Sequence, residues 1–382
     1  MELRYLTPDD LDDVLDVRRR SFGPMPAADV ERWRDLVTPI LPEGRYLGAF
    51  DGARLAATAR LRPFSQWWYG RPQSMAGVAG VTVNPEDRGR GVGSLIMRAI
   101  IDRAVELGDA VSALFPATTP IYRSLGFEHA GAQHTVTVPA EALRTIRPAG
   151  QVKLRRMGPD DAAEVMAILD RVHRAARASG PISANEAGWR WWLDEPDDFL
   201  YLADDGYVIY RWSGHDIEVD NLVAASEETA KALWSMVGSS SSIADSVTAN
   251  LAPDDPVLWL LRERSKEQVR QTRWMFRVLD VPEAVARRGY PAGVTLDAAV
   301  EVADPVRESN AATWRLEVSG GTGAAIRSLD QGPRLTINGF SALYAGIPTA
   351  TLRLAGLMSG DTRHDEALDT AFAARPYMLD YF

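Results

Sequence analysis

"VNPEDRGRGVGSLI" occupies residues 83–96 and places three glycines and four charged residues between an apolar run and an amphipathic one. The run before it, residues 76–83, is rich in valine and has the composition of a strand. After it, apolar residues recur at helical spacing from Val92 to Ile100, and Gly108 marks the end of the pattern. The stretch is therefore predicted to be a loop that joins a strand to the first turn of a helix.

A glycine-rich loop at a helix start is suited to phosphate, because the first N–H groups of the helix point outward and glycines let the backbone approach a ligand. A Walker A loop carries a lysine after its last glycine, but here Ser94 follows Gly93 directly. A dinucleotide-binding loop has the spacing G-x-G-x-x-G, whereas Gly89, Gly91 and Gly93 are spaced G-x-G-x-G. The pattern that remains is R-x-x-G-x-G, which begins at Arg88.

A second motif, "IYRSLGF" at residues 121–127, bears on what the loop binds. The loop resembles the acetyl-CoA loop of the GNAT acetyltransferases. Tyr122, four residues before Gly126-Phe127, resembles the second signature of that family. Two motifs in this order are more specific than either alone, and an exposed turn with solvated arginines is the alternative interpretation of the loop.

The pattern of hairpins suggests that the same fold occurs twice. Residues 45–64 are predicted to form a hairpin around Asp51-Gly52, and residues 199–212 a hairpin around Asp205-Gly206. The two layouts correspond, so we expect a duplicated α/β fold.

The second copy differs where the first has its glycine loop. Ser226 is expected to cap a helix, and Glu227 and Glu228 follow it in the first turn. Two carboxylates at this position would repel a phosphate, so the second copy is expected to have lost its ligand. "SSSS" at residues 239–242 is interpreted as a short flexible bend within this copy.

A third part is expected near residue 280. In residues 294–302 and 311–318 apolar and polar residues alternate, as in strands with one face exposed to solvent. Residues 343–360 are apolar and are interrupted by glycines. These patterns indicate a small α+β domain.

The order of the three parts is similar to that of the Eis (enhanced intracellular survival) family of actinobacterial acetyltransferases, as are "SFG" at residues 21–23 and the terminal "YF". The resemblance implies an α/β (α+β) chain with tandem GNAT folds, the second degenerate, and a C-terminal sterol-carrier-protein-like α+β domain. The expected boundaries are 1–147 for the catalytic GNAT domain, 148–279 for the degenerate one and 280–382 for the last.

The resemblance also implies how acetyl-CoA is held. Main-chain groups along a splayed strand would bind the pantetheine arm, and a plain core strand is the alternative interpretation of the same residues. The loop would bind the pyrophosphate through its N–H groups and positive charge. The strand residues are Val81, Thr82 and Val83; the loop residues are Arg88, Gly89, Arg90, Gly91, Val92 and Gly93, with Ser94 adding a hydroxyl contact.

Acetyl transfer from a thioester to an amine needs a base for the amine and an acid for the departing thiolate. Tyr122 matches the general acid of the GNAT family. The alternative interpretation is that Tyr122 is a core residue whose hydroxyl is hydrogen-bonded. The Eis resemblance assigns the base to the C-terminal carboxylate of Phe382. The chain ends in "PYMLDYF", apolar and aromatic to the last residue, which also suits a tail that merely docks.

The acceptor pocket is expected between the first helices and the sheet. Phe22, Asp29 and Trp33 are the candidate lining residues, because aromatic walls and carboxylates suit a cationic amine. The resemblance implies an aminoglycoside-like molecule, a polyamine or a lysine side chain as acceptor. Trp67 and Trp68 would line the rim or pack in the core, and the core is favoured.

Composition limits the partners. The net charge of −10 argues against nucleic-acid binding, which needs basic faces. The chain has no cysteine, so no thiol-based acyl-enzyme can form and the acetyl group is expected to pass directly to the amine. The five histidines lack metal-ligand spacing, and no metal is assigned.

No apolar run is long enough to span a bilayer, and no signal peptide is recognised, so a cytoplasmic location is expected. The Eis resemblance implies a homohexamer. The alternative function is a non-catalytic protein that senses CoA or binds lipid through its C-terminal domain.

Overall fold

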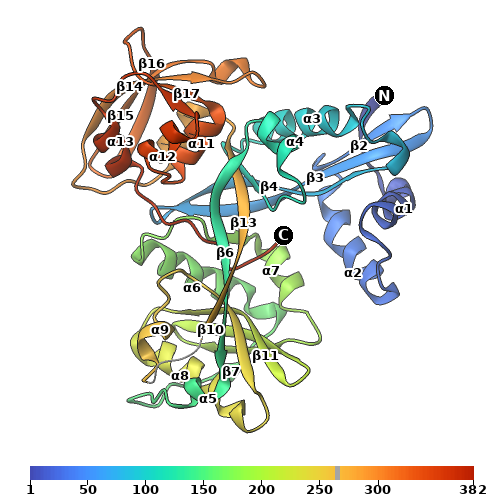
Figure 1. The fold of residues 1–382 in the computed structure, drawn as a ribbon. Coiled ribbons are helices and arrows are strands. Elements are labelled where there is room, and N and C mark those ends of the chain that lie inside the picture. Colours follow the sequence, from blue (N-terminus) through green and yellow to red (C-terminus); the bar gives the residue numbers. More distant parts are fainter. Residues whose placement is uncertain (263–266) are drawn as a thin grey trace.

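The computed structural model describes residues 1–262 and 267–382, which form three parts along the chain (Figure 1). In the first part, the predicted hairpin, strand and helix are confirmed. The helix α3 (Val92–Glu106) packs on the sheet because Ile96, Ile100 and Ala104 form one buried face. The other elements are β1 (Glu2–Tyr5), α1 (Leu11–Phe22), α2 (Ala27–Val37), β2 (Tyr46–Asp51), β3 (Arg54–Trp68), β4 (Arg71–Val83), β5 (Val111–Leu114), α4 (Thr119–Ser124) and β6 (Glu128–Pro139).

The second part repeats this arrangement, and its hairpin is also confirmed. The helix α8 (Glu227–Gly238) begins at its predicted cap, where the Ser226 hydroxyl accepts a hydrogen bond from the Thr229 N–H. The expected bend at residues 239–242 is a short 3-10 helix instead. The other elements are α5 (Ala140–Arg144), β7 (Arg155–Arg156), α6 (Ala162–Ala175), β8 (Ile182–Ala184), α7 (Glu186–Trp192), β9 (Phe199–Ala203), β10 (Gly206–Ser213), β11 (Asp216–Ala224), β12 (Ser246–Leu251), α9 (Val257–Leu260) and β13 (Gln268–Val278).

The third part has a separate sheet of five strands in the order β16-β15-β14-β17-β18. It is joined to β13 of the second part by a buried ion pair, in which Arg277 Nη2 lies 2.8 Å from Asp304 Oδ2. The Gln73 side chain also donates to the Tyr344 hydroxyl at 2.6 Å. The elements are α10 (Val281–Arg287), β14 (Leu296–Ala303), β15 (Ala312–Ser319), β16 (Thr322–Arg327), β17 (Arg334–Thr336), α11 (Ile337–Tyr344), α12 (Thr349–Leu354), β18 (Met358–Ser359) and α13 (Asp365–Ala371).

The first two parts share one sheet and exchange strands. Its order is β1-β2-β3-β4-β5-β13-β6-β12-β11-β10-β9-β7, with β8 paired to β3. Strand β13 of the second part lies between β5 and β6 of the first, so that Met275 is opposite Leu114 on one side and His129 on the other. Strand β6 in turn pairs with β12, where Val136 is opposite Ala249. The sequence predicted two consecutive folds but not this exchange.

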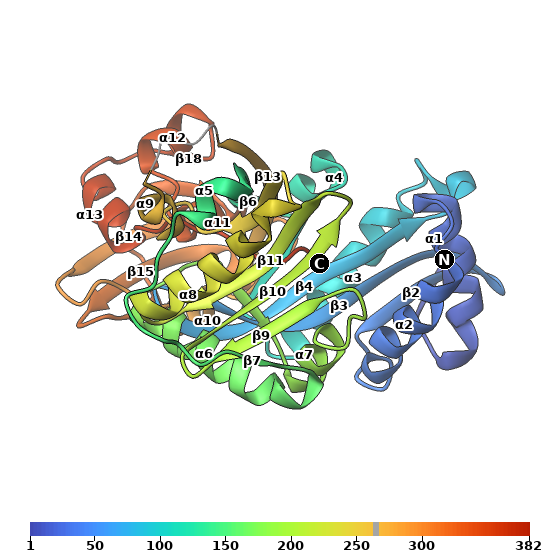
Figure 2. The same ribbon diagram turned by 90° about the horizontal axis from the view of Figure 1, so that it is seen from below.

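The chain after α13 leaves the third part and returns to the junction of the other two, and two views place the C-terminus near the middle of the molecule (Figures 1 and 2). Backbone and side-chain hydrogen bonds hold this tail. The Met378 N–H donates to the Ala132 carbonyl at 3.3 Å, and the Gln133 amide donates to the Leu379 carbonyl at 2.7 Å. Among the described residues, no helix is both long and apolar enough to cross a membrane.

Candidate active site

Strands β4 and β5 separate halfway along β4. They pair only where Met75–Gly77 faces Val111–Ala113, and β4 continues to Val83 without a partner on that side. A bulge in β4 accompanies the separation, and Gly80 there has a left-handed φ of 58°. The edge that contains Val81, Thr82 and Val83 thus has no strand of β5 beside it, as expected for a strand that binds an extended ligand.

The glycine loop follows this strand directly. Gly89 and Gly91 have φ values of 75° and 80°, which favour glycine, and a Cβ built on either would meet no atom within 4 Å. Gly91 is the N-cap of α3 and provides no side-chain cap. The first N–H groups of α3, including those of Gly93 and Ser94, therefore begin the helix beside open space, which suits a pyrophosphate.

The two arginines of the loop differ in their availability. The Arg90 guanidinium donates to Asp87 at 2.7 Å, and Arg54 binds the same carboxylate at 2.6 Å. The hydrogen bond from Arg54 is the main reason that the pKa of Asp87 lies below its usual value. Arg88 is exposed, donates to the Val83 carbonyl at 3.3 Å, and has no carboxylate partner among the described residues. Arg88 is thus the loop arginine without a carboxylate partner in the described part of the chain, whereas Arg90 is paired with Asp87.

Tyr122 lies on α4, beside the start of α3. A Cβ built on Gly93 would come within 3.0 Å of Ile121, so the two segments are in close contact. Tyr122 is 7% exposed, and burial raises the pKa of its phenol above the usual value. Its hydroxyl has no hydrogen-bond partner within residues 1–262 and 267–382 and is free to meet a ligand.

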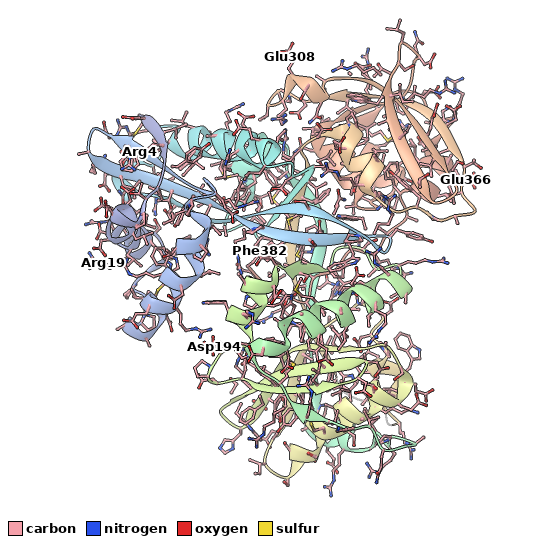
Figure 3. All side chains as sticks on the ribbon, turned by 180° about the vertical axis from the view of Figure 1, so that it is seen from behind. Arg4, Arg19, Asp194, Glu308, Glu366 and Phe382 are labelled. Atoms are coloured by element: carbon pink, nitrogen blue, oxygen red, sulfur yellow. The ribbon has the colours of Figure 1, made fainter. Side chains whose placement is uncertain are left out.

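Phe382 reaches the opening between β4 and β5. Its ring lies 4.9 Å from that of Phe64 and 5.6 Å from that of Phe115, which follows β5. A Cβ built on Gly77 would lie 2.9 Å from the Phe382 ring, at the point where β4 and β5 part. Figure 3 shows Phe382 between the strands of the first part and the helices of the second. Phe382 therefore lies where β4 and β5 separate.

The three residues expected to line the acceptor pocket lie on the first two helices and differ in their exposure. Trp33 is 8% exposed and packs with Leu11 and Val37 in the apolar cluster under α1 and α2, and its interpretation as a pocket wall stays a prediction. Phe22 is 57% exposed at the end of α1, one residue after Ser21, whose hydroxyl donates to the Val83 carbonyl. Asp29 is exposed in the first turn of α2.

Trp67 and Trp68 are buried at 3% and 0% exposure, which confirms that they belong to the core.

A pocket of about 380 Å³ lies next to Phe382, and Tyr381 is among its lining residues. Its wall on α7 includes Trp192, whose ring stacks on Phe64 at 6.4 Å. Five carboxylates and two arginines line it. The carboxylates are Glu195, Asp198, Glu218, Asp220 and Asp380, and the arginines are Arg211 and Arg270.

Most of these pocket residues come from the second part of the chain, and sequence reasoning missed them. The aromatic and acidic run "RWWLDEPDD" at residues 190–198 was the available signal. Asp380 lies on the tail, where the Asn221 amide donates to it at 2.8 Å. Burial nevertheless raises the pKa of Asp380 to about 7. Its carboxylate therefore changes charge near neutral pH.

Comparison with known proteins agrees with this geometry. Residues 2–130 and residues 180–278 each match a family described as an acetyltransferase (GNAT) domain, and residues 281–379 match the sterol carrier protein domain. The chain is 45% identical to a GCN5-related N-acetyltransferase of Kribbella flavida of solved structure, with a TM-score of 0.97 over 100% of this chain and 98% of that one. The chain belongs to the GCN5-related N-acetyltransferases.

Two further relatives show how far the likeness of this acetyltransferase extends. An uncharacterized N-acetyltransferase of Streptomyces avermitilis is 28% identical over 98% of this chain and 99% of its own. Eis1 of Mycobacterium abscessus has the same fold, with a TM-score of 0.78 and 23% identity over the whole of both chains. The tandem GNAT domains and the sterol-carrier-like domain expected from the sequence are confirmed. The family uses acetyl-CoA as co-substrate.

Proposed function

We propose that this acetyltransferase moves the acetyl group of acetyl-CoA directly to a primary amine of a cationic small molecule, such as an aminoglycoside-like compound or a polyamine, or of a lysine. The observation that carries the proposal is the position of Phe382. The Phe382 ring contacts Phe64, Phe115 and Gly77 where β4 and β5 part, and the adjacent Tyr381 lines an acidic, aromatic pocket.

The donor is held by the strand and the loop. Main-chain groups of Val81–Val83 bind the pantetheine arm along the free edge of β4. The N–H groups from Gly89 to Ser94 and the charge of Arg88 bind the pyrophosphate. Open space in front of Gly89 and Gly91 supports this assignment, because a phosphate can approach the backbone there.

The terminal carboxylate of Phe382 acts as the general base, directly or through one water. It accepts a proton from the amine, which can then attack the thioester carbonyl. The aromatic contacts of Phe382 with Phe64 and Phe115 fix the end of the chain and limit access of water to it.

The Tyr122 hydroxyl acts as the general acid toward the leaving thiolate. It belongs to the segment that contacts the start of α3, so it lies beside the donor loop. Its raised pKa keeps the phenol protonated at neutral pH, which is the form that can donate a proton.

The pocket beside Phe382 supports a cationic acceptor. Its five carboxylates outnumber its two arginines, and Arg211 is already bound to Asp198 and Asp220. Trp191 and Trp192 add aromatic faces that attract ammonium groups. Phe22 and Asp29 remain candidates for the outer edge of the same site.

The boundaries after residues 147 and 279, the homohexamer and the cytoplasmic location stay predictions. Light scattering of the purified protein would test the hexamer, and a monomer would exclude it.

The function is tested by measuring thiol release from acetyl-CoA with aminoglycosides, polyamines and lysine peptides as acceptors. The chain has no cysteine, so it adds no background to a thiol assay. We expect release with multivalent amines and little with an uncharged amine. Acetyl-CoA binding without release for any amine would contradict the proposed activity.

A further inference from the structure

The second part has an opening that corresponds to the donor site of the first. Strands β11 and β12 pair only where Ile217–Val219 faces Val247–Ala249, and β11 continues to Ala224 without β12 beside it. A pocket of about 720 Å³ lies at the carboxyl ends of these strands, against α8 and the C-terminal tail. This volume is in the range of sites for small organic ligands.

The pocket is unsuited to a phosphate. The start of α8 is capped by its own Ser226, and Glu227 and Glu228 place negative charge in its first turn. The lining is more apolar than polar, and Leu222 and Trp234 contribute large side chains to it. A ligand here needs an apolar body rather than a nucleotide.

One end of the pocket is polar and acidic. Asp254 is exposed and Asp255 is half-buried, with one Asp255 oxygen accepting from the Val257 N–H at 3.0 Å. The Tyr377 hydroxyl, whose pKa is raised by burial and by Asp255, has no hydrogen-bond partner among the described residues. These groups offer two carboxylates and a hydroxyl to a ligand that brings positive charge or donors.

A buried histidine supports the same chemistry. His173 lines the pocket, is 3% exposed, and its Nδ1 has no hydrogen-bond partner in the described part of the chain. Burial lowers the pKa of this imidazole to about 4, so it is neutral at physiological pH and does not repel a cation. Two arginines also line the pocket: Arg177 turns its guanidinium to the Tyr69 ring at 5.8 Å, and Arg375 is exposed on the tail.

We propose that this pocket is a second ligand site, which binds an apolar amine. The hydrocarbon or aromatic body packs on Trp234 and Leu222, and the protonated amino group is held by Asp254 and Asp255. This pocket and the pocket beside Phe382 share only Leu379 among their lining residues, and the occupation of this site does not depend on the proposed catalytic roles.

Calorimetry on the full chain tests this site with N,N-dimethyl-4-phenylbutylamine as probe. A tertiary amine cannot form a stable amide, so binding is measured without turnover. We expect one saturable site, with 4-phenylbutanol, the neutral analogue, bound about tenfold more weakly. The absence of saturable binding of the amine would overturn the proposal.

Two variants assign the site. Ala176→Trp adds an indole at an exposed lining position, so it should abolish binding without disturbing the core. Asp255→Asn keeps an acceptor for the Val257 N–H but removes the charge, and affinity should fall about tenfold. Glu308→Gln, an exposed position on the third part, is the matched control and should bind like the wild type. Binding that survives Ala176→Trp would place the probe elsewhere and refute the site.

Discussion

Extending the chain by Gly-Ser after Phe382 is expected to lower kcat/KM without unfolding the protein. Each added residue moves the terminal carboxylate by up to about 3.8 Å along the chain, which exceeds the tolerance of a hydrogen bond. The Phe382 ring can keep its contacts with Phe64 and Phe115, because the extension starts beyond them. The perturbation therefore removes the base and leaves its support in place.

A positioned general base contributes about 10²-fold to 10⁴-fold in rate. Some activity should remain because an amine can lose its proton to water, so we expect a loss of about 100-fold, or roughly 2.7 kcal/mol of transition-state stabilisation. The assay is thiol release under initial-rate conditions, together with the Kd of acetyl-CoA and the Tm. Both the Kd and the Tm should match the wild-type values.

Two controls isolate the carboxylate. Gly-Ser placed before Met1, which is 47% exposed and far from the splay along β1, should leave the rate unchanged. Phe382→Leu keeps both the carboxylate and an apolar side chain beside Phe64 and Phe115, so its loss of kcat/KM should be smaller than that of the extended chain. An extended chain with wild-type kcat/KM would refute the role of Phe382, and a parallel loss of acetyl-CoA binding would indicate damage to the donor site instead.

Four further results are expected. Tyr122→Phe should lower kcat about 100-fold with the Kd of acetyl-CoA unchanged, and an unchanged kcat would remove Tyr122 as the acid. Arg88→Gln should weaken acetyl-CoA binding about tenfold, whereas Arg90→Gln should have a smaller effect because that guanidinium is paired; equal effects would contradict the assignment of the free cation. The Asp380 carboxyl is neutral below and charged above its pKa of about 7, so the KM of a dicationic acceptor should fall as pH rises through 7, and Asp380→Asn should flatten this profile. Asp304→Ala leaves a buried arginine without its partner and should lower the free energy of unfolding by about 3–5 kcal/mol in urea, while a change below about 1 kcal/mol would show that the pair is dispensable.

The local features of the donor site could be predicted from the sequence. The glycines at 89 and 91 allow the left-handed backbone that the loop adopts, the apolar period after Val92 indicates a helix, and both signals lie within a few residues of one another. The cap at Ser226 was predictable for the same reason, since capping depends on the identity of one residue and its position before the first turn.

The acceptor side could not be predicted in this way. A tryptophan such as Trp33 suits a pocket wall and an apolar core equally well, and the sequence does not show that it packs in the cluster under α1 and α2. Trp192 and Asp380 reach the site from segments that are far from the first part along the sequence. Such contacts depend on which strands pair and on where the C-terminal tail packs. The spacing of apolar residues along the sequence predicts neither of these.

Strand β13 of the second copy lies between two strands of the first copy, and this position limits how the chain can evolve. If the second copy were deleted, β5 and β6 would each lose the neighbour that now separates them, and two edges with unpaired N–H and C=O groups would be open to other chains. A duplicate can lose its own substrate by a few mutations at a helix start. It cannot then be discarded, because the surviving enzyme is built partly from its strands.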